Sequence, residues 1–286
     1  MPAKAEPLRL PCGQCIGCRL DRSRHWATRC MHEARMHDQN SFITLTYDED
    51  HLPLDGSLVL PHWQNFMKKL RHVAAEFTDQ KLKFFHCGEY GEQFKRPHYH
   101  ALIFGFDFAD RRLWKVSNDI TVYTSAALDA LWGQGFCTVG DVTWESAAYC
   151  ARYTLKKVNG PLEKKPSKKT GLLPYERIHR FTGEVIEVEK EYCTMSRRPG
   201  LGAKFYADFG ADIYPHDECI VNGQKTRPPR YYDNLYERDD PVDMERIREE
   251  RIRVMQAFMP DNTRARLSDK RKVKEAQTSQ LIREVE

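Results

Sequence analysis

Two histidines separated by one residue are the feature of this sequence with the clearest chemical potential. The segment 96–105 reads RPHYHALIFG, so His98 and His100 flank a single tyrosine, Tyr99. Successive side chains of a strand point to opposite faces, so a strand here places both imidazoles on one face and Tyr99 on the other. Pro97 fits the start of such a strand, where its missing N–H costs least. Two adjacent imidazoles on one face can bind one metal ion, and the alternative is a strand with two surface histidines.

A carboxylate precedes the histidines in the chain. Glu89 lies in the segment GEYG, which ends a strand predicted over 82–90, and Glu92 lies in the following loop. If this strand pairs with the histidine strand as a hairpin, Glu89 comes close to His98 and His100. Two imidazoles and one carboxylate form a partial coordination sphere with open positions, as a catalytic metal requires. A solvent-exposed loop acid is the better interpretation of Glu92 and an equal alternative for Glu89.

Two tyrosines one helical turn apart are the third signal. Tyr149 and Tyr153 fall in a segment, 146–157, that is predicted to be helical, and their spacing of four places them on one face. Lys156 lies three residues further on and shares that face approximately. Two phenols and a cation on one surface could attack a phosphodiester and stabilise the resulting charge. Aromatic residues at this spacing more often pack into a core, which is the alternative.

Together these residues suggest metal-assisted phosphoryl transfer with a tyrosine nucleophile. A phenol has a pKa of about 10 and attacks weakly at neutral pH, so it needs a phosphodiester already polarised by a cation. A divalent ion on the two histidines and Glu89 would provide that polarisation. Attack would form a phosphotyrosine and release a 3′-hydroxyl, and the link would retain the bond energy needed to rejoin strands. A second tyrosine would permit a second transesterification, and Tyr153, closer to Lys156 and Lys157, is the preferred first nucleophile.

The elements that must position these residues alternate between strands and helices. Besides the histidine strand, the residue pattern predicts strands over 41–47, 82–90 and 135–142, helices over 19–37, 61–77, 125–132 and 146–157, and a hairpin over 177–188. The chain after residue 107 is interpreted as helical or irregular up to the helix at 125.

The combination of motifs resembles the HUH endonuclease superfamily in its rolling-circle replication initiators. The residues that carry the resemblance are the strand FITLTY over 42–47, Glu89 in GEYG, the RPHYH segment, and Tyr149 and Tyr153 with Lys156. The cysteine knuckle with its arginine-rich helix, and the turn MSRRPGLG over 195–202, resemble more narrowly the replication initiator of microviruses, of the gokushovirus type. The resemblance covers roughly residues 12–202.

This resemblance implies both a fold and an activity. The implied fold is α+β, an RRM-like or ferredoxin-like antiparallel sheet with helices on one face, a central histidine strand and the tyrosine helix beside it. The implied activity is nicking of one strand of single-stranded or supercoiled origin DNA, covalent attachment to the 5′ end, later rejoining, and dependence on Mg²⁺ or Mn²⁺. Histidine ligands favour Mn²⁺, because Mg²⁺ prefers oxygen. The sequence contains no P-loop motif, so a host helicase and polymerase are expected partners.

Three closely spaced thiols precede the first helix. The spacing of Cys12, Cys15 and Cys18 resembles the start of a bacterial ferredoxin segment, but arginine occupies the position of the expected fourth cysteine. A structural zinc site completed by Cys30, or by a histidine such as His25, is one interpretation, and free structural thiols are the other. Zinc would fix the leader to the arginine helix and take no part in catalysis.

Basic residues that could contact DNA occur in two places. The candidates are Arg19, Arg22 and Arg24 in the first helix and Arg197 and Arg198 in the glycine-rich turn. Such residues can face phosphates, although a solvated charged surface is the commoner explanation of an arginine-rich helix.

The overall composition is compatible with a DNA-binding protein. The chain has 286 residues and a formal net charge of +4, which permits an acidic partner without requiring one. Neither a membrane-spanning apolar run nor the apolar region of a secretory signal is evident, and the nine cysteines are unevenly spaced. The expected location is therefore the cytoplasm of the bacterial host, with no membrane partner and reduced thiols.

Three regions are expected. Residues 1–40 contain the cysteine knuckle and arginine-rich helix, and residues 41–215 form the endonuclease domain, with a basic linker and hairpin over 158–200. Residues 216–286 form a charged arm, helical or partly disordered, that serves interactions rather than the core.

Two other functions remain open from the sequence. A non-catalytic RRM-like protein could stack single-stranded bases on Trp26, Tyr47 or Tyr99, but this leaves the paired histidines and paired tyrosines unexplained. A metal-dependent hydrolase using water would leave both tyrosines as packing residues. A covalent protein–DNA adduct that survives denaturation would distinguish the nicking enzyme from both alternatives.

Overall fold

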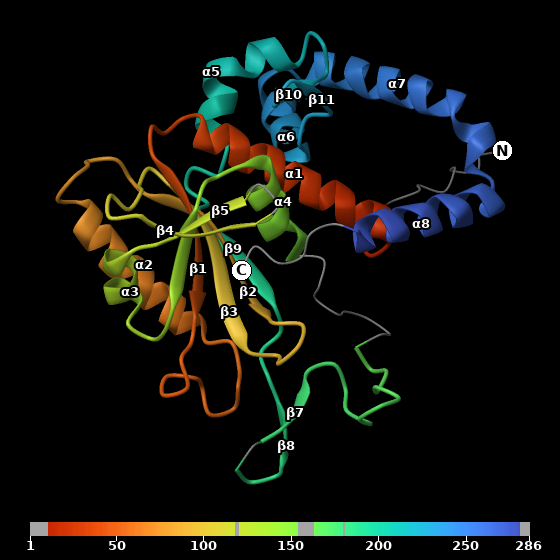
Figure 1. Ribbon diagram of the computed structural model, residues 1–286. Helices are drawn as coiled ribbons and strands as arrows, with labels where there is room; N and C mark the ends of the chain where they lie inside the picture. Colours follow the sequence, from red (N-terminus) through yellow and green to blue (C-terminus); the bar gives the residue numbers. More distant parts are fainter. Residues whose placement is uncertain (1–10, 118–119, 154–162, 180, 281–286) are drawn as a thin grey trace.

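A seven-stranded antiparallel sheet organises the protein (Figure 1). The computed structural model describes residues 11–117, 120–153, 163–179 and 181–280, except the side chain of Tyr153. The order across the sheet is β4-β5-β6-β1-β3-β2-β9. The strands are β1 Asn40–Thr46, β2 Lys83–Tyr90, β3 Pro97–Phe104, β4 Arg112–Ser117, β5 Ile120–Thr124, β6 Cys137–Gly140 and β9 Tyr192–Met195. The histidine strand β3 lies between β1 and β2, as predicted.

Helices cover both faces of this sheet (Figure 1). The four helices that cover it are α1 Ile16–Ala34, α2 Leu60–Ala74, α3 Ala126–Trp132 and α4 Trp144–Tyr153. Helices α2 and α3 pack on one face, where Trp63, Phe66 and Leu70 of α2 recur at helical spacing and are buried. Helices α1 and α4 pack on the other face, where Cys30 and Cys150 lie against Phe85 and its neighbours.

The centre of the fold has the predicted ferredoxin-like organisation. The elements β1-α2-β2-β3-α3-β6 follow the βαββαβ order, and their strands are arranged β6-β1-β3-β2. In this unit both helices lie on one face, as the resemblance implies. The prediction is incomplete in one respect: α1 and α4 are additional helices that bury the second face, on which the histidines lie.

Two segments differ from the sequence-based interpretation. The stretch before α3 was expected to be helical or irregular, but β4 and β5 pair there as an antiparallel hairpin at the edge of the sheet. Strand β9, at the opposite edge, pairs with β2 and was also not predicted. The hairpin predicted over 177–188 is confirmed as β7 Glu176–Ile178 paired with β8 Val185–Glu187.

The C-terminal part of the described chain is mainly helical. Its elements are α5 Ala203–Ile213, β10 Cys219–Val221, β11 Gln224–Thr226, α6 Arg230–Asp239, α7 Pro241–Ala257, the short 3₁₀ helix η2 Met259–Asn262 and α8 Arg264–Ser279. A third apolar cluster joins α5, α6 and the start of α7, with Phe205, Tyr232 and Met244 buried in it. The expected arm is therefore mainly helical where it is described, but it begins with the β10–β11 hairpin, and its first part is packed rather than projecting.

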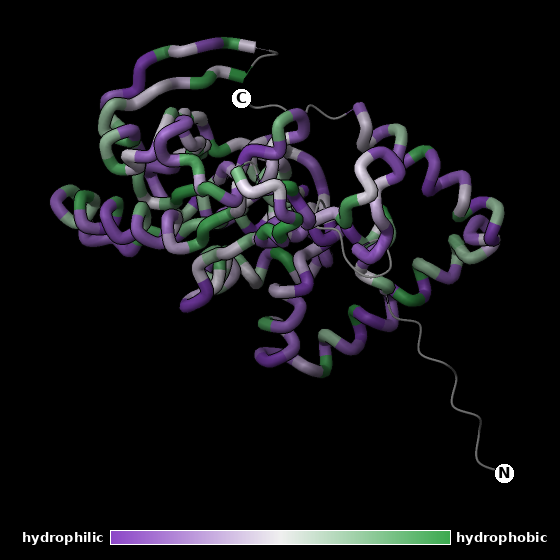
Figure 2. The backbone as a smooth tube through the Cα atoms, turned by 90° about the horizontal axis from the view of Figure 1, so that it is seen from below, coloured by the Kyte–Doolittle hydropathy of each residue, from purple (hydrophilic) through white to green (hydrophobic). Residues whose placement is uncertain are grey.

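Hydropathy along the backbone differs between the centre of the molecule and the outer C-terminal helices. Figure 2 shows hydrophobic segments gathering near the centre of the molecule and mostly hydrophilic colours along the outer helices of the C-terminal part. Within the described residues, no helix combines the length and the apolarity needed to cross a bilayer.

Candidate metal centre and tyrosine helix

The β2–β3 hairpin brings the predicted ligands together. Glu89 is directly opposite His98 in the antiparallel register, and His100 follows on the same face. The Oε1 atom of Glu89 lies 2.7 Å from Nε2 of His98 and 3.0 Å from Nε2 of His100. All three side chains are buried. The hairpin that the sequence required is therefore present, and three potential ligand atoms converge on one point.

Both imidazoles also make a polar contact at Nδ1, the ring nitrogen that does not face Glu89. Nδ1 of His98 lies 3.2 Å from the carbonyl oxygen of Arg96, and Nδ1 of His100 lies 2.9 Å from Oγ1 of Thr44. A proton on Nδ1 of His98 can be donated to that carbonyl, so that Nε2 would become the ligand atom once it gives up the proton that it donates to Glu89. Such contacts fix ring orientation and raise ligand basicity at metal sites.

The carboxylate of Glu89 is charged at neutral pH. Burial alone would raise its pKa, but hydrogen bonds with His100 and His98 outweigh burial and lower the pKa to about 2. A buried negative charge between two imidazoles is the electrostatic environment that a divalent cation requires.

The donor set fits a divalent metal ion of the Mn²⁺ or Mg²⁺ type. Neighbouring ligands of an octahedral ion with bonds of about 2.1 Å lie about 3 Å apart. The distances of Glu89 to His98 and His100, 2.7 and 3.0 Å, are close to that value. Two nitrogens and one carboxylate leave coordination positions for phosphate oxygens. Glu92 is exposed in the hairpin turn and does not join this cluster.

Helix α4 places Tyr149 beside the centre. The hydroxyl of Tyr149 lies 3.5 Å from Nε2 of His100, and the two rings are perpendicular with centroids 5.0 Å apart. Tyr149 is also buried among the apolar residues of this face, so it both packs and points its hydroxyl at the candidate ligand His100. Tyr153 ends α4, but its side chain lies outside the described residues, as does the whole of Lys156.

Two residues of β1 complete the site and were not singled out from the sequence. Phe42 stacks on His100 with an interplanar angle of 9°, and Thr44 makes the hydrogen bond to His100 described above. Both lie on the histidine face of β1, because β1 and β3 pair directly. The alternation in FITLTY contained this signal, but the pairing of β1 with β3 had to be known before it could be used.

The predicted DNA-binding arginines are dispersed. Arg22 is exposed near the start of α1, and Arg19 is partly buried one turn earlier. The Arg24 guanidinium is 2.7 Å from both Oγ1 of Thr226 and the Arg227 carbonyl, so Arg24 connects α1 to the C-terminal end of β11.

The two arginines of the glycine-rich turn lie away from the metal centre. Arg197 and Arg198 are exposed and follow Ser196, whose amide bonds to the Phe84 carbonyl. Glu89 follows Phe84 by five positions, which corresponds to about 16 Å along β2. The turn is therefore at the opposite end of the strand from the ligands.

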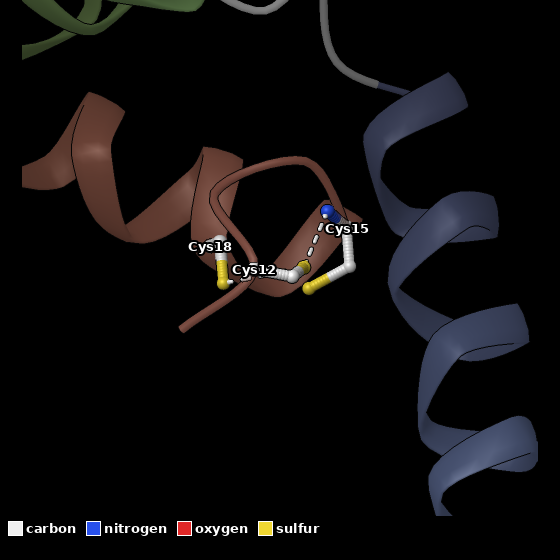
Figure 3. A group of neighbouring side chains, drawn as sticks. All are labelled: Cys12, Cys15 and Cys18. Carbon is white, nitrogen blue, oxygen red and sulfur yellow. Dashed lines mark hydrogen bonds between the residues drawn. The ribbon is translucent and has the colours of Figure 1, made fainter. Parts of the chain in front are cut away.

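Three thiols gather at the start of α1, and Cys30 is not among them. The Sγ atoms of Cys12, Cys15 and Cys18 all lie within 4.8 Å of one another (Figure 3). Backbone hydrogen bonds from Cys15 and Gln14 lower the pKa of the Cys12 thiol to about 7. Cys30 is fully buried in the core beneath α1, so the predicted four-cysteine set does not form.

The aromatic residues considered as base-stacking platforms are mostly internal. Tyr47 and Tyr99 are buried, and their hydroxyls are hydrogen-bonded to each other at 2.9 Å. Trp26 is partly buried against Phe85, with ring centroids 5.1 Å apart. Neither Tyr47 nor Tyr99 can stack on a base in this arrangement.

Comparison with known proteins gives a consistent family. A family model described as replication-associated protein ORF2/G2P matches residues 40–158, the interval from β1 through α4. The replication-associated protein ORF2 of Spiroplasma virus 4 is 31% identical over 257 residues, covering 86% of this chain and 73% of that protein. The replication-associated protein VP4 of Bdellovibrio phage phiMH2K is 32% identical over 237 residues, covering 81% and 68%.

A third relative extends the pattern. The replication-associated protein ORF4 of Chlamydia phage 1 is 30% identical over 232 residues, covering 79% of this chain and 53% of that protein. No solved structure matches the chain. These relatives confirm the resemblance to microvirus replication initiators inferred from the motifs. The chain belongs to the replication-associated protein ORF2/G2P family of bacterial viruses.

Proposed function

We propose that this protein initiates replication of a phage genome by nicking one strand of origin DNA through metal-assisted transesterification. Membership of the replication-associated protein family supports the role in replication. The observation that carries the chemistry is the 3.5 Å approach of the Tyr149 hydroxyl to Nε2 of His100, the same nitrogen that faces Glu89. A nucleophile and a ligand set for a cation thus lie side by side.

Each described residue has a distinct part in this reaction. Glu89, His98 and His100 would hold the divalent ion, which supplies positive charge next to a phosphate oxygen. Tyr149 is placed to attack phosphorus with its hydroxyl oxygen. One P–O bond forms to the tyrosine and the P–O3′ bond breaks, so the phenolic proton is balanced by the proton gained at the 3′-hydroxyl. The 5′-phosphotyrosine retains a phosphodiester bond, and attack by a 3′-hydroxyl rejoins the strand.

The other nucleophile in the proposal is Tyr153. It follows Tyr149 by four residues in the same helix, which corresponds to a rise of about 6 Å. The two phenols could therefore act successively on one phosphate held beside Glu89, His98 and His100, with Lys156 stabilising charge. Which tyrosine attacks first remains a prediction, with Tyr153 preferred for its proximity in sequence to Lys156.

We propose that the DNA strand crosses the histidine face of the sheet over β6, β5 and β4, the strands on the far side of β1 from the histidine strand β3. Thr46 is opposite His98, and the amide of Thr46 bonds to the Phe136 carbonyl, so Phe136 extends the same row across the sheet. Phe136 is 43% exposed, and its ring contacts Trp114, which is 48% exposed. Lys115 lies over the Trp114 ring at 4.7 Å. Exposed aromatics next to cations are the surface that single-stranded bases and phosphates recognise.

A cavity lies on the same part of the histidine face. It has a volume of about 290 Å³ and lies between β5, β6 and the start of α4, with Phe42, Thr138 and Ser146 in its wall. Phe42 also stacks on His100, so the cavity adjoins the ligand cluster. We propose that it accommodates a nucleotide next to the scissile phosphate.

Other partners follow from the same proposal. The sequence has no P-loop motif, so unwinding and synthesis would depend on a host helicase and polymerase in the bacterial cytoplasm. Single-stranded or supercoiled origin DNA is the proposed substrate.

The test uses the purified full chain, a single-stranded origin oligonucleotide labelled at its 3′ end, and Mn²⁺. The predicted product is a protein–DNA adduct that survives denaturation and disappears when the metal is chelated. Replacing His98 or His100 by alanine should abolish the adduct while most DNA binding remains, because phosphate contacts come mainly from other residues. Glu89→Ala should weaken cleavage strongly.

The control is Glu92→Ala, which removes an exposed carboxylate three residues away and should leave cleavage near the wild-type rate. Normal nicking by a double histidine variant would overturn the metal centre. Cleavage that yields a 5′-phosphate and no adduct would instead identify a hydrolase that uses water.

A further inference from the structure

We propose that Cys12, Cys15 and Cys18 bind one zinc ion at the N-terminus of α1, a site separate from the catalytic ligands. The three Sγ atoms lie within 4.8 Å of one another, and those of Cys12 and Cys18 are 4.0 Å apart. Tetrahedral zinc with Zn–S bonds of about 2.3 Å places its sulfurs about 3.8 Å apart. A disulfide would instead require about 2 Å. The thiols therefore already stand at approximately the spacing of a zinc–thiolate site.

The local backbone favours thiolates at this position. Cys15 is the N-cap of α1, a helix of 19 residues, and makes no side-chain capping bond. Its amide instead donates to Sγ of Cys12 at 3.3 Å (Figure 3). The positive end of the helix dipole and such backbone donors both stabilise negative sulfur. At the start of α1 a thiol sulfur therefore accepts a backbone hydrogen bond, and the N-cap side chain makes no capping hydrogen bond.

A basic helix lies beside the thiols. Figure 3 shows α8 running next to the knuckle. The sequence of α8 contains six lysines and arginines against two acids. Three thiolates and one Zn²⁺ carry a net charge of −1, so the charge of α8 complements the loaded site.

The remaining coordination position is open to water. In the part of the chain that the structure describes, no fourth histidine, cysteine or carboxylate joins the three thiols. Cys30 lies twelve residues after Cys18 in α1, which corresponds to about 18 Å along the helix, and its side chain is buried in the core. Zinc with three protein ligands and a water in the fourth position is the coordination found in catalytic zinc sites. The site would fix the segment before α1 to the helix that carries Arg19 and Arg22.

The experiment measures zinc in the full-length chain purified without chelators. One zinc ion per chain is expected, and serine at Cys12, Cys15 or Cys18 should weaken zinc binding at least about 100-fold, more than an outer contact of a metal site contributes. Cys193→Ala, which removes a partly buried thiol on β9, is the matched control and should bind zinc like wild type.

Cobalt substitution separates this site from the catalytic one. The thiolate-to-cobalt absorption band should persist in a His98→Ala, His100→Ala double variant and disappear in Cys18→Ser. The proposal is overturned if wild type shows no such band, if Cys18→Ser retains it, or if the chain purifies with iron and sulfide instead. None of these readouts depends on DNA cleavage, so they stand or fall independently of the nicking activity.

Discussion

Acid should loosen the interface between α1 and the α5–α6 cluster through one buried histidine, His32. Its ring stacks on Phe205 with centroids 3.8 Å apart, and its Nδ1 lies 3.0 Å from the hydroxyl of Tyr232. Nε2 has no hydrogen-bond partner among the described residues. Burial, with a smaller contribution from Arg35, lowers the pKa of His32 from 6.5 to about 4.

The direction of this pH effect on stability follows from how many protons the folded and unfolded states bind. Between pH 6.5 and 4 the unfolded chain binds a proton at His32 and the folded protein does not, so stability falls as the pH falls. The contribution of His32 is fully present above pH 6.5 and lost by about pH 4. At about 1.4 kcal/mol per pH unit, the loss reaches up to about 3 kcal/mol at pH 4 and about 2.5 kcal/mol at pH 4.5.

The assay compares wild type with His32→Phe by urea unfolding at several pH values between 7 and 4.5. Phenylalanine retains a ring on Phe205 but cannot titrate, and at pH 7 it should cost about 1 kcal/mol through the lost hydrogen bond to Tyr232. Other titrating groups are common to both proteins, so they cancel in the difference. Between pH 7 and 4.5 the free energy of unfolding of the variant, relative to that of wild type, should rise by about 2.5 kcal/mol. The variant should therefore be the less stable protein at pH 7 and the more stable one at pH 4.5. A difference that stays constant with pH would refute the reasoning.

Two further predictions concern stacking and a buried ion pair. Trp114→Ala should weaken binding of single-stranded DNA by about 1–3 kcal/mol in fluorescence anisotropy, whereas Leu113→Ala on the same strand should not; equal effects would rule out base stacking. Lys83→Met should lower the free energy of unfolding by about 1–3 kcal/mol in urea unfolding, because Lys83 lies 2.8 Å from the buried Glu33 carboxylate, which would keep only its hydrogen bonds with His37 and the Gly202 amide. Replacing the exposed Lys81 by methionine is the control. Similar losses of unfolding free energy in both variants would show that the Lys83–Glu33 pair contributes little.

The convergence of Glu89, His98 and His100 could be predicted because its evidence is local. His98 and His100 are two residues apart in one strand, and Glu89 is separated from them only by a tight hairpin. Alternation along a strand and pairing across a hairpin are sufficient to bring such residues together. The packing of Tyr149 against His100 is less local, and the sequence indicated only that both tyrosines share a helix face.

The missed parts depend on long-range packing. Strand β4 has exposed apolar residues and an irregular register between Leu113 and Lys115, so its sequence lacks a clear period of two. Cys30 was grouped with the knuckle because all four cysteines are close in sequence, but the face of α1 that packs on the sheet directs Cys30 into the core. The third apolar cluster was not foreseen, because its residues are spread over α5, α6 and α7 within a highly charged sequence.

The most direct test of the central claim is to map the tyrosine that becomes linked to DNA. Wild type incubated with a single-stranded origin oligonucleotide and Mn²⁺ should yield a peptide from α4 with a nucleotide on Tyr149 or Tyr153. First cleavage should survive in at least one single phenylalanine variant, whereas a complete cycle of nicking, transfer and rejoining should fail in either. The double variant should bind the oligonucleotide and form no adduct. An adduct that persists in the double variant, or that maps outside α4, would contradict the proposal that these two tyrosines are the nucleophiles.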